Sequence, residues 1–364
     1  MGFTIASGTF AVMASRMTSP FRRLAVVVGL VGALMAGSCL WVRPSLVAMP
    51  VVPDGGYGFS VGAPQSWMSD ADADRELDAV ARTRGEWMRM LIDWHIVEPI
   101  KGQYNWQYVD HWVNGSTQRG LKVLGLIAYS FAWARAPGSY FSAPPVNPAD
   151  YAAFVTAVVQ RYGDRVAHWE IWNEPNLPLF FGFTDNRAAV YTELLKAVYP
   201  AIKAIQPDAT VIAAGLSRAT GLDAPTKFLA DMYASGARKF FDATAMHPYV
   251  FPGGIAEDGD NGWSDLVRVH DLMTVNGDGD KKVWMTELGA STCAPQARGV
   301  SQDEQARQIL QVLAGVAGAG WSGPAFIFAV RDTDTAKRDD LESNFGALLT
   351  SDWKPKFTAA VLAR

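Results

Sequence analysis

The chain has 364 residues, with 32 Lys and Arg against 36 Asp and Glu, which gives a formal net charge of −4. A hydrophobic fraction of 49% with 19% charged residues excludes an intrinsically disordered chain. The acidic balance argues against a nucleic-acid binder, whose surface would be basic. Two cysteines are too few for a disulfide-rich scaffold or a four-thiolate metal site.

The first fifty residues differ in composition from the rest of the chain. Residues 1–50 contain four arginines and no acidic residue, and Arg22 and Arg23 directly precede an uncharged run of 19 residues at 24–42. A basic flank and an apolar run are typical of a secretory signal, and this run just reaches membrane-spanning length. We therefore expect residues 1–50 to be a signal peptide or an N-terminal membrane anchor. The domain at 51–364 would be secreted or held at the outer face of the cytoplasmic membrane.

Beyond residue 55, apolar runs alternate with segments of helical periodicity. The apolar runs predict strands at 57–62, 87–92, 122–128, 168–172, 210–214, 243–247, 283–287 and 325–329. The segments between and after them predict helices at 71–84, 108–119, 148–162, 187–205, 225–235, 263–275, 302–318 and 353–362. Several strands are apolar on both faces, as a buried parallel sheet requires, so the pattern predicts an α/β fold and a single-domain (β/α)₈ TIM barrel. A doubly wound open sheet is the alternative, disfavoured because no GxGxxG motif opens an early helix.

Polar residues gather where these strands end, which is where barrel enzymes place their chemistry. Glu174 follows the fourth strand and Glu287 ends the seventh, so we expect the two carboxyls to face each other across the barrel mouth. Glycosidic-bond cleavage needs such a pair, one to protonate the leaving oxygen and one to act at the anomeric carbon. A retaining mechanism predicts about 5–5.5 Å between the carboxyls, and a separation near 9 Å would contradict it.

The segments HWEIWNEPN at 168–176 and WMTELG at 284–289 resemble the two catalytic signatures of clan GH-A glycoside hydrolases. Within that clan the sequence looks most similar to family 39, and next to the family 5 cellulases. The clan consists of retaining (β/α)₈ barrels. The resemblance therefore implies that Glu174 is the acid/base and that Glu287 is the nucleophile.

The resemblance extends to residues around the two glutamates. It implies that Arg89 holds the nucleophile, that Asn173 binds the sugar 2-hydroxyl, and that His247 and Tyr249 form an H-x-Y pair on the sixth strand. It also covers the segment after the second strand, at 94–110, and in all it covers nearly all of residues 55–364.

Two tryptophans at strand ends are further candidates for the site. Trp94 follows the second strand and Trp133 follows the third, and a flat apolar ring suits the face of a sugar. We therefore expect both to contribute to substrate binding.

The sequence departs from the family pattern in two places. The eighth strand, AFIFAVRD, lacks the tryptophan that many clan members place under the sugar, and Phe328 and Arg331 are candidates to replace it. The β-sandwich that follows the barrel in family 39 β-xylosidases and α-L-iduronidases has no counterpart in this sequence. The chain thus looks more like the single-barrel relatives, which include an exopolysaccharide endoglycosidase.

We expect an exported, monomeric, retaining glycoside hydrolase that acts on an oligo- or polysaccharide without a metal or cofactor. No HExxH motif occurs, and no acidic loop supplies a complete calcium ligand set. Two alternatives remain. One is a transglycosylase that remodels extracellular glycan with the same two glutamates, and the other is an inactive barrel that only binds glycan.

Overall fold

The computed structural model describes residues 51–62, 65–256 and 262–364. The predicted export segment at 1–50 lies outside these residues. Within them, no helix combines the length and the apolar character needed to cross a membrane.

The eight predicted strands form a closed barrel in chain order. They are β1 (Tyr57–Ser60), β2 (Trp87–Asp93), β3 (Lys122–Ala128), β4 (His168–Asn173), β5 (Thr210–Ser217), β6 (Ala243–His247), β7 (Val283–Leu288) and β8 (Ser322–Phe328). Each strand runs parallel to the next, and β8 pairs with β1, with Tyr57 opposite Ala325, to close the barrel. The predicted (β/α)₈ TIM barrel is therefore confirmed for the described part of the chain.

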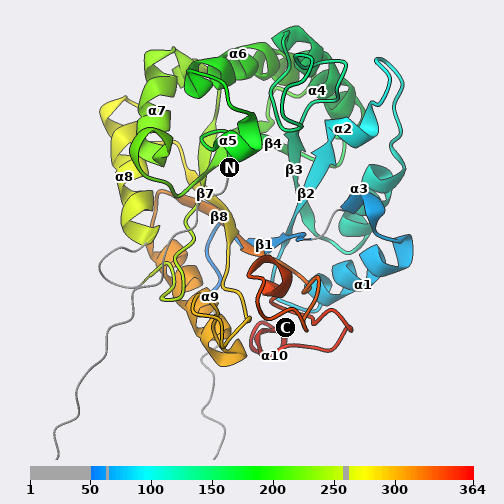
Figure 1. The fold of residues 1–364 in the computed structure, drawn as a ribbon, viewed down its shortest axis with the longest axis vertical. Coiled ribbons are helices and arrows are strands. Elements are labelled where there is room, and N and C mark those ends of the chain that lie inside the picture. The colour runs from blue at the N-terminus through cyan, green and yellow to red at the C-terminus, as the bar shows by residue number, and fades with distance from the viewer. Residues whose placement is uncertain (1–50, 63–64, 257–261) are drawn as a thin grey trace, which may run out of the picture. The chain divides into compact units, whose positions relative to one another are not determined.

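Helices lie around the outside of the strands (Figure 1). They are α1 (Asp70–Ala81), α2 (Trp94–Val97), α3 (Gln107–Gln118), α4 (Pro148–Tyr162), α5 (Pro178–Phe181), α6 (Arg187–Ile205), α7 (Pro225–Ala234), α8 (Gly262–Val275), α9 (Gln302–Gly318) and α10 (Phe357–Val361). The predicted last helix, at 353–362, is shorter than expected. Trp353 has a φ of 67° in a turn in which the Trp353 N–H donates to the Thr350 carbonyl, so helix α10 begins only after that turn.

Short polar side chains fix where several helices begin. The Ser69 hydroxyl accepts a hydrogen bond from the Asp72 N–H at the start of α1, and Ser301 does the same for α9. Asn147 caps α4, whose first residue is a proline. These caps satisfy backbone donors that the helix itself leaves unpaired.

The N-terminal end of the barrel is filled by aromatic rings. Trp87 on β2, Trp284 on β7 and Phe326 on β8 are buried, and the Trp87 and Trp284 ring centroids lie 5.5 Å apart. His168 on β4 packs edge-on against Trp87. These rings close the barrel floor by hydrophobic packing.

The barrel interior becomes polar one level above this floor. Side chains two residues apart on a strand share a face. The residues two positions further along β2, β4 and β7 are Arg89, Glu170 and Thr286, and all three are buried. The strand period therefore places a charged layer between the aromatic floor and the barrel mouth.

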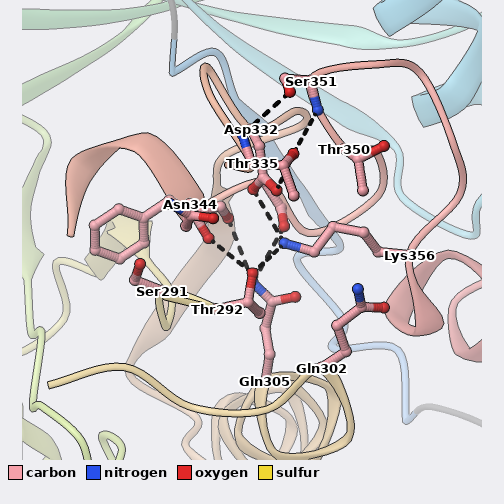
Figure 2. A network of polar contacts seen from close by, with 12 residues as sticks. Ser291, Thr292, Gln302, Gln305, Asp332, Thr335, Asn344, Thr350, Ser351 and Lys356 are labelled. Carbon is pink, nitrogen blue, oxygen red and sulfur yellow. Dashed lines mark hydrogen bonds and ion pairs between the residues drawn. The ribbon is translucent and has the colours of Figure 1, made fainter. Parts of the chain in front are cut away.

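A buried ion pair anchors the segment that follows β8 (Figure 2). The Lys356 Nζ lies 3.0 Å from Asp332 Oδ1 and donates to the Thr292 hydroxyl at 2.7 Å, and neither charged side chain has exposed surface. From α9, Gln305 Nε2 donates to the Ala290 carbonyl. The network joins the loops after β7 and β8 to the chain before α10.

Replacing Lys356 with methionine should lower the free energy of unfolding by about 3–5 kcal/mol, because Asp332 would remain as an uncompensated buried charge. The double variant Lys356→Met/Asp332→Leu should recover most of this loss, because it removes both charges. Urea denaturation at neutral pH measures both values. A single variant as stable as the wild type would contradict a structural role for the pair.

Candidate active site

Arg89 connects three strands at the centre of the barrel. Its side chain is 3% exposed, and its Nε lies 2.6 Å from Glu170 Oε2 on β4. Its Nη1 lies 2.7 Å from Glu287 Oε1 on β7, and its Nη2 donates to Asn173 Oδ1 at 3.0 Å. Burial acts to lower the pKa of Arg89, but the charges of Glu170 and Glu287 outweigh it, so the pKa is raised. Arg89 is therefore a permanent buried cation.

Glu287 is held in its ionised form. Its Oε1 accepts from Arg89, and its Oε2 accepts from the Tyr249 hydroxyl at 3.1 Å. Burial acts to raise the pKa of Glu287. The charges of His247 and Arg89, with the hydrogen bonds from Arg89 and Tyr249, outweigh burial and lower that pKa. A carboxylate at this position is ready to act as a nucleophile or to stabilise a cation.

Glu174 has a different partner from Glu287. The His247 Nδ1 lies 2.8 Å from Glu174 Oε1 and 3.7 Å from Glu287 Oε2. A carboxylate oxygen of Glu174, a ring nitrogen of His247 and a carboxylate oxygen of Glu287 all lie within 4.8 Å of one another. Burial acts to lower the pKa of His247, but Glu287 and Glu174 outweigh it, so that pKa is raised.

A hydrogen-bonded chain sets the proton positions on His247. The Thr286 hydroxyl donates to Glu170 Oε1 at 2.8 Å and lies 3.0 Å from His247 Nε2. Because a hydroxyl has one proton, Thr286 can only accept from His247, so Nε2 carries a hydrogen. The His247 Nδ1 then shares a single proton with Glu174. That proton lies either on the imidazole or on the carboxyl.

Local backbone irregularities aim the two glutamates into the barrel mouth. Trp172 and Glu174 have φ values of 72° and 44°, in a backbone region that residues other than glycine rarely adopt. On β7 the register with β8 shifts between Met285 and Leu288, which re-aims Glu287. On β5, a Cβ added to Gly215 would lie 2.1 Å from His247 Nε2, so glycine leaves the space that His247 occupies.

Of the two tryptophans predicted to bind sugar, Trp94 is buried and Trp133 is partly exposed. Trp94 has no exposed surface, because its ring packs against Tyr151 and Phe154 of α4 and its Nε1 donates to Glu98. Trp133 is partly exposed, but it packs edge-on against Trp94 and donates to the Glu98 carbonyl. Trp94 is thus a core residue, and a buried ring cannot stack on a substrate.

Of the two residues proposed to replace the eighth-strand tryptophan, only Phe328 lies at the site. Its ring is edge-on to Tyr249, with centroids 6.5 Å apart. Arg331 instead donates to Glu76 at 2.8 Å and covers the Trp353 ring. The structure thus brings together Arg89, Asn173, Glu174, His247, Tyr249, Glu287 and Phe328.

This site contains two further residues that were not predicted from the sequence, Glu170 and Thr286. Glu170 accepts from Arg89 and Thr286, and Thr286 contacts His247. The signal for Glu170 was present, because a glutamate within a strand as apolar as HWEIW needs a buried cation. No comparable signal marks Thr286, since threonine is an ordinary strand residue.

Among the described residues, Glu174, His247 and Glu287 form a group whose donor atoms lie close enough together to hold a metal ion. Their donor atoms already have protein partners, and the Arg89 guanidinium lies 2.7 Å from Glu287. A cation placed there would face a fixed positive charge, so the donor set fits a proton-transfer site better than a metal site.

Comparisons with known proteins agree with the barrel fold. No family model matches the chain. A family 39 glycoside hydrolase from the gut symbiont Bacteroides cellulosilyticus WH2 superposes with a TM-score of 0.66 at 25% identity, covering 84% of this chain and 63% of its own. A monomeric beta-xylosidase from Caulobacter crescentus CB15 gives 0.64 at 19% identity, covering 86% of this chain and 68% of its own. GH5_18 from Streptomyces cattleya, in complex with GlcNAc, gives 0.63 at 16% identity, covering 86% and 79%.

The chain resembles clan GH-A glycoside hydrolases, family 39 in particular. In sequence, it is 27% identical over 103 residues to Endo-1,4-beta-xylanase 1 of Gibberella zeae, which covers 26% of this chain and 28% of the xylanase. The chain thus spans less than two thirds of the length of the family 39 hydrolase and of the xylanase.

The hydrogen bonds that link Glu170, Thr286 and His247 can be tested by substituting Thr286. Thr286→Val should lower the pKa of His247, because the imidazolium loses the acceptor for its Nε2 hydrogen. Thr286→Ser keeps a hydroxyl and should titrate like the wild type. Histidine ¹⁵N shifts recorded against pH measure both, and identical titrations of the valine and serine variants would contradict the assigned chain.

Proposed function

We propose that the chain is a retaining glycoside hydrolase, with Glu174 as acid/base and Glu287 as nucleophile. The observation that carries the proposal is the unequal environment of two neighbouring carboxyls. Glu287 is paired with a guanidinium and a phenol, and Glu174 shares a proton with His247. Environments that separate the protonation of two carboxyls are the basis of acid and nucleophile assignments.

In the first step, the Glu287 carboxylate attacks the anomeric carbon while Glu174 gives its proton to the leaving oxygen. The bond to the leaving sugar breaks, and a covalent ester forms between the substrate and Glu287. Asn173, held by Arg89 through its Oδ1, is placed to donate from its amide nitrogen to a sugar hydroxyl. The ester removes the negative charge of Glu287, so Arg89 loses one of its two counterions.

In the second step, Glu174 is a carboxylate and takes a proton from a water molecule that attacks the same carbon. The ester to Glu287 breaks, and the carboxylate regains its partners Arg89 and Tyr249. The His247 imidazole, whose Nε2 hydrogen is held by Thr286, stays oriented toward Glu174 through both steps.

The close approach of the two carboxyls favours a retaining over an inverting route. Retaining enzymes hold the carboxyls about 5–5.5 Å apart, whereas inverting enzymes need roughly 6.5–9.5 Å to fit a water molecule. Oxygens of Glu174 and Glu287 lie within 4.8 Å of each other, and this short distance supports the retaining mechanism.

We also propose that the chain is exported and acts on carbohydrate as a monomer. The sequence of residues 1–50 supports export through its basic flank and apolar run. A monomeric state agrees with the description of the Caulobacter neighbour as monomeric.

Glu174→Gln and Glu287→Gln should each lower kcat/KM by about 10³-fold or more, since one removes the proton donor and the other the attacking oxygen. Release of sugar from a panel of oligosaccharides measures this, and proton NMR identifies the first-formed anomer, which should keep the configuration of the substrate. Glu193→Gln, on the exposed face of α6, is the matched control and should behave like the wild type.

Near-wild-type activity in either variant would contradict that residue's role, provided that its unfolding temperature is unchanged. An inverted first product would contradict the retaining mechanism. Lengthened chains in place of hydrolysis products would indicate a transglycosylase, and an unchanged panel would indicate a binding protein.

Tyr249→Phe should move the acidic limb of the kcat/KM profile to higher pH. The reaction needs Glu287 ionised, and the Tyr249 hydroxyl lowers the pKa of that carboxyl by donating to it. Without the hydroxyl the pKa rises, and activity is lost at a higher pH as the solution is acidified. Tyr140→Phe, at an exposed ring, is the control, and an acidic limb unchanged in Tyr249→Phe would contradict this assignment.

A further inference from the structure

A cavity of about 490 Å³ opens beside Glu287, lined mainly by the ends of β1, β2 and β3 and by the segments that follow them. Arg89 and Asn173 line it together with Glu287. A molecule held there can therefore contact the residue that we propose as the nucleophile. We call this space the Glu287 cavity.

Gln65 lines the Glu287 cavity with a buried amide group, in a single helical turn after β1. The residue is 5% exposed, and its Oε1 accepts from the Leu91 N–H at 2.6 Å. Because a backbone N–H can only donate, this contact fixes which end of the amide is the oxygen. The other end, Nε2, has no hydrogen-bond partner among the described residues. A buried donor of this kind costs stability unless a ligand supplies an acceptor.

Tyr129, directly after β3, brings a second polar group to the same cavity. Burial, with the charges of Glu174, Glu287 and Asp93, raises the pKa of Tyr129, so its hydroxyl lies in the field of three carboxyls. Within the described ranges, no group forms a hydrogen bond with that hydroxyl. The φ of Tyr129 is 65°, and non-glycine residues in this backbone region gather at functional sites.

Aromatic rings hold Tyr129 in place and border the cavity. The Tyr129 ring packs edge-on against the buried Trp172, with centroids 5.9 Å apart, and is tilted against Phe141 at 6.4 Å. Phe141 is 53% exposed and Trp67 is 81% exposed, and both line the cavity. Exposed flat rings beside buried polar groups suit a sugar, which has apolar faces and a rim of hydroxyls.

The charge of the cavity disfavours an anionic sugar. Arg89 is already paired with Glu170 and Glu287, so these three side chains together carry one negative charge. Burial raises the pKa of Asp93 to about 7, so at neutral pH Asp93 adds to this negative charge. Burial also lowers the pKa of His95, which keeps its imidazole neutral at pH 7. A neutral sugar therefore fits the cavity better than an acidic one.

We propose that the Glu287 cavity binds a ring of a neutral sugar, with Gln65 and Tyr129 as residues that determine specificity. Gln65 Nε2 donates to one sugar hydroxyl, and the Tyr129 hydroxyl pairs with a second. A site built to bind a substrate hydroxyl rejects an analogue that lacks it, because the protein groups are then left unpaired. This inference rests on the proposed function, since Glu287 must contact the sugar that it attacks.

Deoxy sugars combined with Tyr129→Phe and Gln65→Met test the proposal. The wild-type chain is assayed on neutral oligosaccharides of β-linked glucose, xylose, mannose and galactose. Then kcat/KM is measured for the best substrate and for its monodeoxy analogues. The wild type should reject at least two analogues by about tenfold or more. Each variant should act about tenfold more slowly on the parent and no longer discriminate against one of these analogues.

Thermal unfolding separates substrate binding from packing. Tyr129→Phe should unfold at the wild-type temperature or above it, because the lost hydroxyl has no partner in the described protein. Tyr151→Phe is the matched control. The Tyr151 hydroxyl donates to the Ile127 carbonyl at 2.6 Å in the core, so this variant should unfold at a lower temperature and keep the wild-type discrimination.

Wild-type discrimination in both Tyr129→Phe and Gln65→Met would overturn the proposal. Faster hydrolysis of β-1,4-linked tetraglucuronate than of every neutral oligosaccharide would also overturn it. If no glycan is hydrolysed, the hydrolase assignment fails, and calorimetric binding of the same neutral oligosaccharides decides the cavity separately. Binding weakened about tenfold in each variant would support the cavity assignment, whereas no binding, or equal binding by wild type and variants, would overturn it.

Discussion

The buried guanidinium of Arg89 is the constraint on which the rest of the site depends. A charge inside a barrel costs several kcal/mol of desolvation unless it is fully paired. Arg89 is paired with two carboxylates, one on β4 and one on β7. Its Nη2 donates a third hydrogen bond, to the Asn173 Oδ1, which fixes the amide group beside Glu174. One cation thus sets the relative positions of strands that are about 80 and 200 residues away along the chain.

The same cation separates the roles of the two carboxyls. Glu287, beside Arg89 and Tyr249, is held ionised, whereas Glu174 meets His247 and so has access to a proton. His247 is oriented in turn by Thr286 and by Glu170, the second counterion of Arg89. The nucleophile and the acid are therefore tuned by one connected network, which explains how two glutamates so close together can act differently.

Most of the fold and most of this network could be predicted from the sequence, but Glu170 and Thr286 were not. Apolar strands alternating with amphipathic helices predict the barrel, and the ends of the strands predict Glu174 and Glu287, because both signals are local. Thr286 was not predicted, because its role depends on contacts that cross the barrel to Glu170 on β4 and to His247 on β6, and these are not visible in the local sequence. The prediction that Trp94 binds sugar was wrong for a similar reason, because its position at the end of a strand does not show that its ring packs against α4. The positive φ values at Trp172 and Glu174 are also invisible in the sequence.

The most direct test of the account is to trap the intermediate. A 2-deoxy-2-fluoro glycoside with a good leaving group slows the second step, so the sugar should remain attached to the protein. Peptide mass spectrometry should then find the adduct on Glu287, and Glu287→Gln should remain unlabelled. An adduct on Glu174 or on any other residue, or turnover of the reagent with no adduct in the wild-type chain, would contradict the assignment of Glu287 as the nucleophile.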